Sequence, residues 1–317
     1  MALYSTTPSG LTWTIVGQGA IGLLAATHLQ QQGAEVALHL RQAKPVDLLF
    51  TAHNGQQQQY CFSAARSVTA SYQNVLVPVK SYDVIAAVHQ LQPLLSSHAQ
   101  LVITHNGMGI IEQVLPLLLP TQGLWFLTTT HAALKTSASA LQHTGQGQSV
   151  LAPINSAAQQ ELINKTDGNK TSISNAMAIA LGPVQVVSDI QPFLWQKLLI
   201  NAVINPLTAI YHCKNGQLLA PQYAADILQI VTEVCAVSKA AGYALSVDDA
   251  MLRVQQVMLA TANNFSSMQQ DVAHQRRTEI NAISGFIVSQ GQQLAIDTPR
   301  NLQLQQQVLQ LQQAYGR

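Results

Sequence analysis

Charged residues are scarce in this chain, which argues against binding partners that are recognised mainly through charge. Asp, Glu, Lys and Arg make up 9% of 317 residues, and 15 basic side chains against 14 acidic ones leave a formal net charge of +1. Nucleic acids and anionic membranes are bound by concentrations of positive charge, so we expect neither as a partner. The 48% of hydrophobic residues is typical of a globular protein.

Cysteines and long apolar runs are also lacking. The three cysteines are odd in number and without the paired spacing of a disulfide framework or a zinc site. No apolar stretch reaches the roughly 18 residues of a membrane span, because prolines and asparagines interrupt the richest segments. Residues 1–10 contain no Lys or Arg, unlike a secretory signal. We therefore expect a soluble, cytoplasmic protein with reduced thiols that acts on a small molecule.

The pattern of apolar residues divides the chain into two parts. A length of 317 residues exceeds what one core usually serves, so two domains sharing a cleft are expected. In the first part, β-rich runs alternate with helix-compatible segments, as in a parallel sheet with crossover helices. From about residue 191, apolar residues recur at three- and four-residue spacing. The expected strands are 11–16, 35–40, 74–79, 100–104, 124–129 and 184–187, and the expected helices are 191–211, 222–242, 246–263 and 279–292.

The predicted fold class is therefore α/β, with an N-terminal doubly wound parallel sheet over residues 1–188 and an all-helical domain over 189–317. The polar segment 155–175 is expected to be a surface excursion, and the glutamine clusters at 56–59 and 303–313 are expected to be solvated faces or loops.

A glycine pattern follows the first expected strand and opens a helix. It reads Gly17, Gln18, Gly19, Ala20, Ile21, Gly22. The first glycine permits a tight turn, the second lets a pyrophosphate approach the backbone, and the third lets helix and strand pack closely. The helix N-terminus then offers N–H groups to the phosphates. The pattern indicates a Rossmann-type dinucleotide site, and the alternative is a glycine-rich turn that binds nothing.

Arg41 follows the second strand, where an NAD site usually carries Asp or Glu. Arginine suits the 2′-phosphate of NADP and leaves no carboxylate to repel it. Arg41 therefore favours NADP(H) as the cofactor. The alternative interpretation is that Arg41 is an ordinary surface arginine at a strand end.

Three polar residues, Lys197, Asn201 and Asn205, stand four apart in an otherwise apolar segment. On a helix this spacing places them along one face. A lysine flanked by apolar residues is expected to be partly buried, which lowers its pKa and improves it as a proton donor to a developing alkoxide. The alternative is an amphipathic helix whose polar face meets water.

Ser267 and Glu279 are twelve residues apart, which on one straight helix would put them on different faces. The serines before residue 268 and Thr278 are good N-cap residues. We expect a helix break, with Ser267 near one helix start and Glu279 in the first turn of the next. Capping alone would explain both residues without a function.

The sequence resembles the ketopantoate reductases of pantothenate biosynthesis over nearly its whole length. The matching stretches are the glycine pattern, 79–82 (VKSY), 105–109 (HNGMG), 128–132 (TTTHA), 197–210, 264–271 and 277–280 (RTEI). The resemblance implies a Rossmann domain followed by a helical domain similar to that of 6-phosphogluconate dehydrogenases. It implies NADPH-dependent reduction of a 2-keto acid.

By this resemblance, Lys197 is the general acid and Glu279 binds the substrate hydroxyl and helps to hold the lysine. Asn106 is implied to contact both cofactor and substrate, and Lys80 and Arg41 to lie beside the nucleotide phosphates. The implied substrate ligands are Asn106, Asn201, Asn205, Asn264 and Ser267, and Glu279 is also an implied cofactor contact. Asp83 stands where many relatives have glutamine, and residues 274–277 lack the Gly-Arg-Pro of many members.

Two other functions compete with this one. A paralogue acting on another 2-keto acid would keep the same fold, and a non-catalytic NADP sensor would keep the nucleotide site. A metal site is not expected, because the histidines show no i, i+4 pair beside a carboxylate. A homodimer is compatible with these features.

Overall fold

The structure is a computed structural model that describes residues 12–65, 71–164 and 172–315. The start of the first expected strand, residues 1–10 and part of the 155–175 segment lie outside the described residues. The chain folds into two compact units. The first comprises residues 1–105 and 110–190, and the second comprises residues 106–109 and 191–317.

The first unit is built on one large mixed sheet with helices on both faces. Its strands are β1 (Thr12–Val16), β2 (Glu35–His39), β3 (Val46–Thr51), β4 (Gln57–Ala64), β5 (Tyr72–Val77), β6 (Leu95–Ile103), β7 (Gly123–Thr129), β8 (Ala132–Ser137), β9 (Ala140–Gly145), β10 (Ser149–Pro153) and β11 (Val184–Val186). Its helices are α1 (Ala20–Gln31), α2 (Ser81–Leu91), α3 (Ile111–Val114), α4 (Ser156–Asn164) and α5 (Ile173–Leu181), with short 3₁₀ turns at Gln92–Leu94 and Leu115–Leu117.

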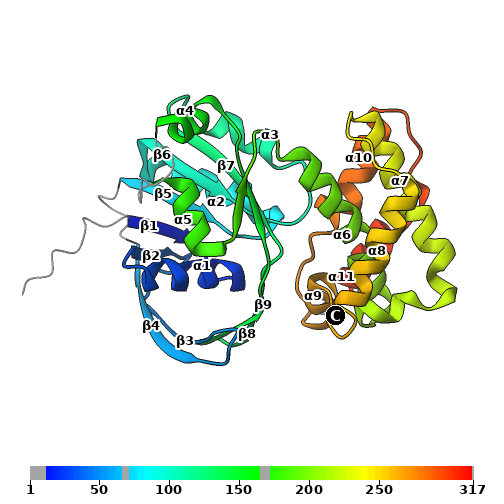
Figure 1. The fold of residues 1–317 in the computed structure, drawn as a ribbon, viewed down its shortest axis with the longest axis horizontal. Coiled ribbons are helices and arrows are strands. Elements are labelled where there is room, and N and C mark those ends of the chain that lie inside the picture. The colour runs from blue at the N-terminus through cyan, green and yellow to red at the C-terminus, as the bar shows by residue number, and fades with distance from the viewer. Residues whose placement is uncertain (1–11, 66–70, 165–171, 316–317) are drawn as a thin grey trace, which may run out of the picture. The chain divides into compact units, whose positions relative to one another are not determined.

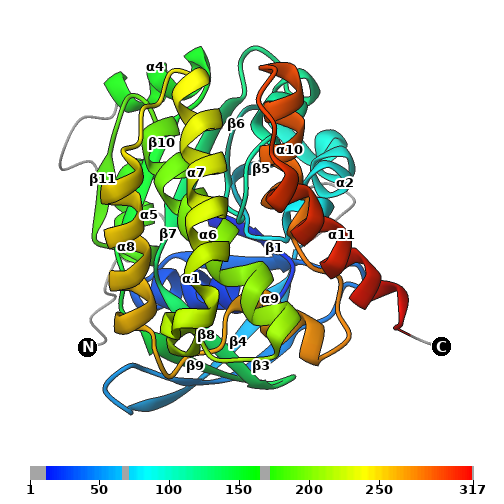
Figure 2. The ribbon, with the colours of Figure 1, turned by 90° about the vertical axis from the view of Figure 1, so that its right-hand side faces the viewer.

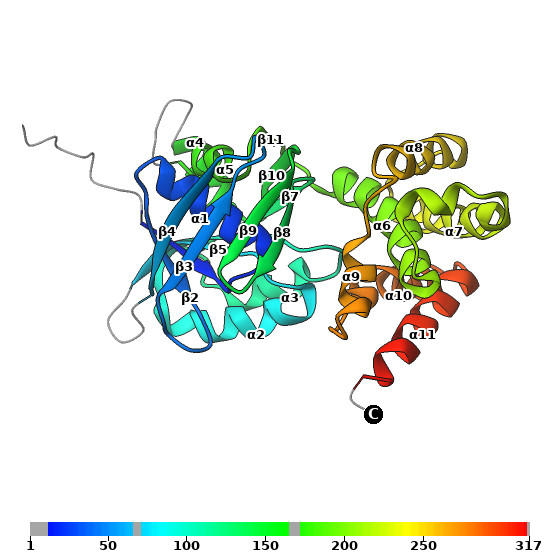
Figure 3. The same ribbon diagram turned by 90° about the horizontal axis from the view of Figure 1, so that it is seen from below.

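The centre of the sheet is parallel. The strand order is β11-β10-β7-β6-β5-β1-β2-β4-β3-β9-β8, and β7, β6, β5, β1 and β2 pair in parallel. Helices α1 and α5 pack together on one face, and α2 and α3 on the other (Figure 3). The apolar strands are buried on both faces because helices cover both, as the uninterrupted apolar runs predicted. The expected doubly wound α/β domain is confirmed.

A glycine in the left-handed conformation follows the end of helix α1. Gly33 has a φ of +83°, and the N–H of Ala34 donates to the carbonyl of Leu29 at 3.1 Å. A left-handed residue just past the last helical turn is where glycine is favoured, since it carries no Cβ. The short connection to β2 completes the first βαβ unit.

Two antiparallel hairpins extend the sheet, and neither was expected from the sequence. β3 pairs with β4, β8 pairs with β9, and β9 joins the hairpins by pairing in parallel with β3 (Figure 1). The glutamines at 57–59 are exposed on β4, so their polar side chains concealed the start of a strand whose Tyr60 and Phe62 are buried in the core. The segment 155–175, expected to be a surface excursion, contains α4 and the start of α5, and most described residues of α4 are exposed or partly exposed.

The second unit is all-helical, as expected. Its helices are α6 (Gln191–Tyr211), α7 (Ala224–Ala240), α8 (Val247–Ala260), α9 (Ser267–Ala273), α10 (Ser284–Gln293) and α11 (Pro299–Gln313), with 3₁₀ turns at Asn215–Leu219, Pro221–Tyr223 and Ile280–Ala282. Helix α6 packs against α7, α8, α9 and α11 (Figure 2). It is therefore the core helix of this unit.

Helix α6 corrects one expectation about length. Among the described residues it alone is long and apolar enough to cross a membrane, with a mean hydropathy of 1.2 over its best window. From the sequence, asparagines are expected to interrupt this apolar segment, but the helix runs unbroken through Asn201 and Asn205. Because 67% of that window is buried inside the protein, its apolar character is explained by packing within the helical unit.

Candidate active-site and nucleotide-binding residues

The glycine-rich turn has the backbone geometry that a dinucleotide site requires. Gly17 has a φ of +82°, and its N–H donates to the carbonyl of His39 at 2.9 Å. A Cβ on Gly22 would lie 2.7 Å from Cγ of Pro78. Glycine at these two positions therefore permits the tight turn and the close packing of α1 against the loop after β5.

The N-terminus of α1 is open to a ligand. Its N-cap is Gly19, no side chain caps it, and no acidic residue stands in its first turn. First-turn N–H groups have no partner within a helix and lie at the positive end of its dipole. The residues Gly17 to Gly22 thus fit the pyrophosphate of a dinucleotide.

Three loops meet at the carboxyl edge of adjacent parallel strands. The glycine turn follows β1, Arg41 follows β2, and Lys80 follows β5 as the N-cap of α2. Ligands of doubly wound folds bind at this edge, where the strand order reverses direction. The structure therefore places the glycine turn, Arg41 and Lys80, which the sequence predicts to bind the nucleotide, at one edge of the sheet.

Arg41 has an acidic neighbour that the sequence did not pair with it. Its Nη2 lies 3.5 Å from Oδ1 of Asp83, with the two side chains 88% and 41% exposed. An exposed pair of this kind contributes little to stability. Its importance is electrostatic, because the carboxylate offsets part of the positive charge at the end of β2.

The polar face of α6 is not simply a solvated stripe. Lys197 is half-buried, Asn205 is 6% exposed, and Nδ2 of Asn201 is buried with no hydrogen-bond partner among the described residues. Burying an amide donor without a partner costs free energy. A face built this way is suited to receiving a polar ligand.

Two opposing effects set the pKa of Lys197. Burial lowers it by disfavouring the charged ammonium, and the carboxylate of Glu279 raises it, with a net pKa of about 8. An ammonium with that pKa is mostly protonated at neutral pH and gives up its proton more readily than a solvated lysine. The partial burial expected from the sequence is confirmed.

Glu279 is 5% exposed and lies just before the 3₁₀ turn Ile280–Ala282. Its Oε2 accepts a hydrogen bond from Nδ2 of Asn106 at 3.0 Å, and its Oε1 accepts from the N–H of Asn106 at 3.4 Å. Asn106 and Glu279 are therefore neighbours although 173 residues separate them.

The segment 106–109 is docked onto the second unit by its backbone. The N–H of Met108 donates to the carbonyl of Ala282 at 2.9 Å, and a Cβ on Gly107 would lie 2.1 Å from that oxygen. Gly107 also has a φ of +82°. The HNGMG stretch thus carries Asn106 to Glu279, and glycine is required for the close approach.

The expected helix break before Glu279 is confirmed, but Glu279 is the N-cap of the 3₁₀ turn Ile280–Ala282 and not part of the first turn of the next helix, which begins at Ser284. Ser266 is the N-cap of α9, accepting a hydrogen bond from the N–H of Gln269 at 3.0 Å, so Ser267 is the first helical residue. The hydroxyl of Ser266 lies 2.7 Å from that of Thr208 on α6. Capping therefore explains Ser266 and not Ser267, which is exposed, as is Asn264.

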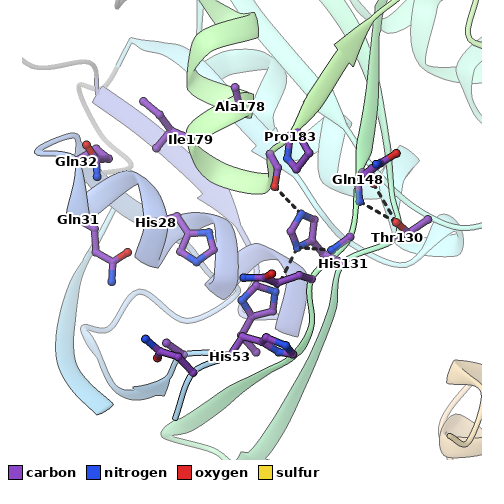
Figure 4. Close-up of a pocket in the computed structure, with 16 residues that line it drawn as sticks. His28, Gln31, Gln32, His53, Thr130, His131, Gln148, Ala178, Ile179 and Pro183 are labelled. Atoms are coloured by element: carbon purple, nitrogen blue, oxygen red, sulfur yellow. Dashed lines mark hydrogen bonds between the residues drawn. The ribbon is translucent and has the colours of Figure 1, made fainter. Parts of the chain in front are cut away.

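A polar cavity of about 930 Å³ lies beside the C-terminal half of α1 (Figure 4). Four histidines line it, His28, His53, His131 and His143, and none of the expected site residues does. The described residues include no group of three or more His, Cys, Asp or Glu that could hold a metal ion. This cavity is distinct from the glycine turn, which lies at the other end of α1.

Comparison with known proteins identifies the family. The model of the family described as "Ketopantoate reductase PanE/ApbA" matches residues 13–156, and that of its C-terminal domain matches residues 189–312. The chain belongs to the ketopantoate reductase family. A curated relative, 2-dehydropantoate 2-reductase of Vibrio cholerae, is 40% identical over 306 residues, covering 96% of this chain and 98% of the relative.

Solved structures agree with the fold of the family. A PanE/ApbA family ketopantoate reductase from Ralstonia eutropha is similar with a TM-score of 0.82 at 26% identity, covering 96% of this chain and 99% of that one. A D-mandelate dehydrogenase solved with NADH and anilino(oxo)acetate has a TM-score of 0.84 at 18% identity, covering 96% and 99%. At 18% identity the second likeness shows the fold alone.

Proposed function

We propose that this protein catalyses the NADPH-dependent reduction of 2-dehydropantoate (ketopantoate) to (R)-pantoate, a step of pantothenate (vitamin B5) biosynthesis. Membership of the ketopantoate reductase family supports the reaction. The observation that carries the proposal is Lys197, a half-buried cation with a pKa of about 8 beside Glu279.

Lys197 is proposed as the general acid. Reduction of a ketone places negative charge on its oxygen, and an ammonium held in a partly desolvated site stabilises that charge more in the transition state than in the ground state. The proton moves from Nζ to the former carbonyl oxygen, which becomes the C2 hydroxyl. Glu279 favours the protonated form of Lys197 before the reaction and accepts a hydrogen bond from the substrate hydroxyl.

Neutral side chains of the second unit are proposed to bind the substrate. The buried Nδ2 of Asn201 supplies a donor without a protein partner among the described residues, and Asn106, Asn205, Asn264 and Ser267 complete the set. Amide and hydroxyl donors bind a carboxylate and hydroxyls at lower desolvation cost than further charges.

The first unit is proposed to hold NADP(H). Residues Gly17 to Gly22 would receive the pyrophosphate, and Arg41 and Lys80 the phosphate charges. Asn106 and Glu279 are also proposed as cofactor contacts. When bound, the nicotinamide supplies the hydride that reduces C2. Arg41 in place of an acidic residue supports NADP over NAD.

A reductase of another 2-keto acid is the second candidate, because the D-mandelate dehydrogenase shares the fold. A non-catalytic NADP sensor is disfavoured, since it has no need of a proton donor paired with a buried carboxylate.

The test compares NADPH oxidation with ketopantoate, pyruvate, 2-ketoisovalerate and oxaloacetate, using the wild type and Lys197→Ala. We expect the highest kcat/KM for ketopantoate, and a fall in kcat of about 10²–10⁴-fold in the variant, the usual contribution of a general acid. NADPH binding measured by fluorescence should be unchanged in Lys197→Ala. A higher kcat/KM for another keto acid would reject the substrate, and intact turnover in the variant would reject the acid.

A further inference from the structure

A lysine from the β8–β9 hairpin reaches the glycine-rich turn. Nζ of Lys135 on β8 donates a hydrogen bond to the backbone carbonyl of Gln18 at 3.1 Å, although 117 residues separate the two. No sequence motif predicted a role for Lys135, because its contact with Gln18 forms only when the β8–β9 hairpin packs against α1.

The hairpin holds Lys135 firmly in this place. β8 and β9 both pack against α1, and β9 pairs with β3 in the main sheet. Within the hairpin, Lys135 stands opposite Leu141, which is 1% exposed. Lys135 itself is half-buried, and burial lowers its pKa. The ammonium is thus presented by a hairpin that is paired into the sheet, and it is partly removed from water.

Its position is electrostatically unfavourable as long as no anion is bound. Gln18 directly precedes the N-cap of α1, and a helix N-terminus carries partial positive charge that repels a cation. Among the described residues Lys135 forms no ion pair, so no carboxylate compensates it. A neutral donor would satisfy the Gln18 carbonyl at lower cost.

We propose that Lys135 is a further positioning residue for the nucleotide. It fixes the glycine-rich turn through the Gln18 carbonyl and adds a positive charge beside the phosphates, supplementing Arg41, whose own charge Asp83 offsets. An anion at the N-terminus of α1 relieves the repulsion between Lys135 and the helix dipole. This inference rests on the proposed dinucleotide site, and it assigns the β8–β9 hairpin a role in cofactor affinity.

The test measures NADPH affinity in three variants of the full-length protein. Lys135→Met removes both charge and hydrogen bond, Lys135→Gln keeps a donor without charge, and Lys135→Arg keeps both. Because charge-assisted bonds are about twice as strong as neutral ones, we expect Kd for NADPH to rise about tenfold in the Met and Gln variants and by about threefold or less in the Arg variant. At saturating NADPH, kcat should stay near the wild-type value, and the salt dependence of binding should become shallower.

Lys239→Met, which removes an exposed lysine at the end of α7, is the matched control and should bind NADPH normally. Wild-type affinity in Lys135→Met or Lys135→Gln would overturn the proposal, as would an equal loss in the Lys239 control. If the wild type itself failed to bind NADPH, the proposed function would fall instead. Melting curves of the variants establish that each one is folded.

Discussion

At the scale of single residues, the proposed chemistry depends on the ammonium of Lys197, which the fold shields only in part from water. Lys197 has a pKa of about 8 because burial and Glu279 act in opposite directions. Burial alone would favour the neutral amine, which cannot donate the proton, and full solvation would leave a weaker acid. The carboxylate of Glu279, which accepts a hydrogen bond from Asn106, therefore keeps Lys197 mostly protonated while burial keeps it a stronger acid than a solvated lysine.

Glu279→Gln tests this balance. Removing the carboxylate removes the effect that raises the pKa of Lys197, so that pKa should fall below 8. A general acid acts in its protonated form, present below its pKa and lost as the pH rises through it. The alkaline limb of the kcat/KM profile should therefore move to lower pH.

Exposed Glu112→Gln on α3 serves as the control and should leave that profile in place. An alkaline limb that stays near the pKa of about 8 while kcat falls would mean that Glu279 acts by contact with the substrate and not through Lys197.

Asp83 is expected to temper the preference for NADPH. It pairs with Arg41, and exposed pairs are worth about 0.2–1 kcal/mol. Asp83→Asn should free the guanidinium for a 2′-phosphate and lower KM for NADPH by up to about fivefold. KM for NADH should change little, and Arg41→Met should abolish the preference. Steady-state kinetics with both cofactors give these values, and an equal effect on NADH would contradict a role at the 2′-phosphate.

At the scale of elements, histidines join the hairpin to the helices of the first unit (Figure 4). Nε2 of His131 bonds the carbonyl of Gly182 at 2.9 Å, and its Nδ1 lies 3.2 Å from Nε2 of His143 and 3.4 Å from the backbone nitrogen of Gly147. Because a carbonyl oxygen only accepts, Nε2 of His131 donates to Gly182. The residues lining the cavity include no Asp, Glu, Lys or Arg.

This junction should make stability depend on pH. Burial lowers the pKa of His28 and of His143, and for His143 the nearby His28 and His131 lower it further. A histidine whose pKa is lowered by folding binds its proton more readily in the unfolded chain, so stability is retained above about pH 6.5 and lost as the pH falls below it. The midpoint of thermal unfolding should be lower at about pH 5.5 than at about pH 7.5.

His143→Asn retains a donor for the Gly145 carbonyl and should show a smaller difference between the two pH values. Exposed His89→Gln on α2 should resemble the wild type. Equal acid sensitivity in all three proteins would show that the junction is not responsible.

Some helices and strands could be predicted from the sequence and others could not. Apolar runs identified the central parallel strands and the long helices because both are buried on most sides. The β3–β4 and β8–β9 hairpins went unseen because their strands lack the uninterrupted apolar runs of the central strands. Buried residues alternate with exposed or half-buried ones along β3, β4 begins with three exposed glutamines, and no residue of β8 is fully buried. Lys135 was missed with the hairpin that carries it.

At the scale of the whole molecule, chain order and spatial grouping diverge at residues 106–109. The segment follows a strand of the first unit but packs with the second, through Met108 and Ala282. The sequence placed it in the first domain. The close approach of Gly107 and Met108 to the backbone of Ala282 joins residues far apart in the chain. A local sequence pattern cannot predict a contact of that kind.

The sequence by itself determined the glycine turn, the doubly wound sheet, the core helix with Lys197, Asn201 and Asn205 on one face, and the break before Glu279. These features follow from spacing and local propensity, which act within a few residues. The tertiary structure alone decided which polar atoms are buried, that Asn106 holds Glu279, that Asp83 meets Arg41 and that Lys135 reaches Gln18. Burial and charge pairing depend on residues far apart in the chain, so the pKa of Lys197 is a property of the fold.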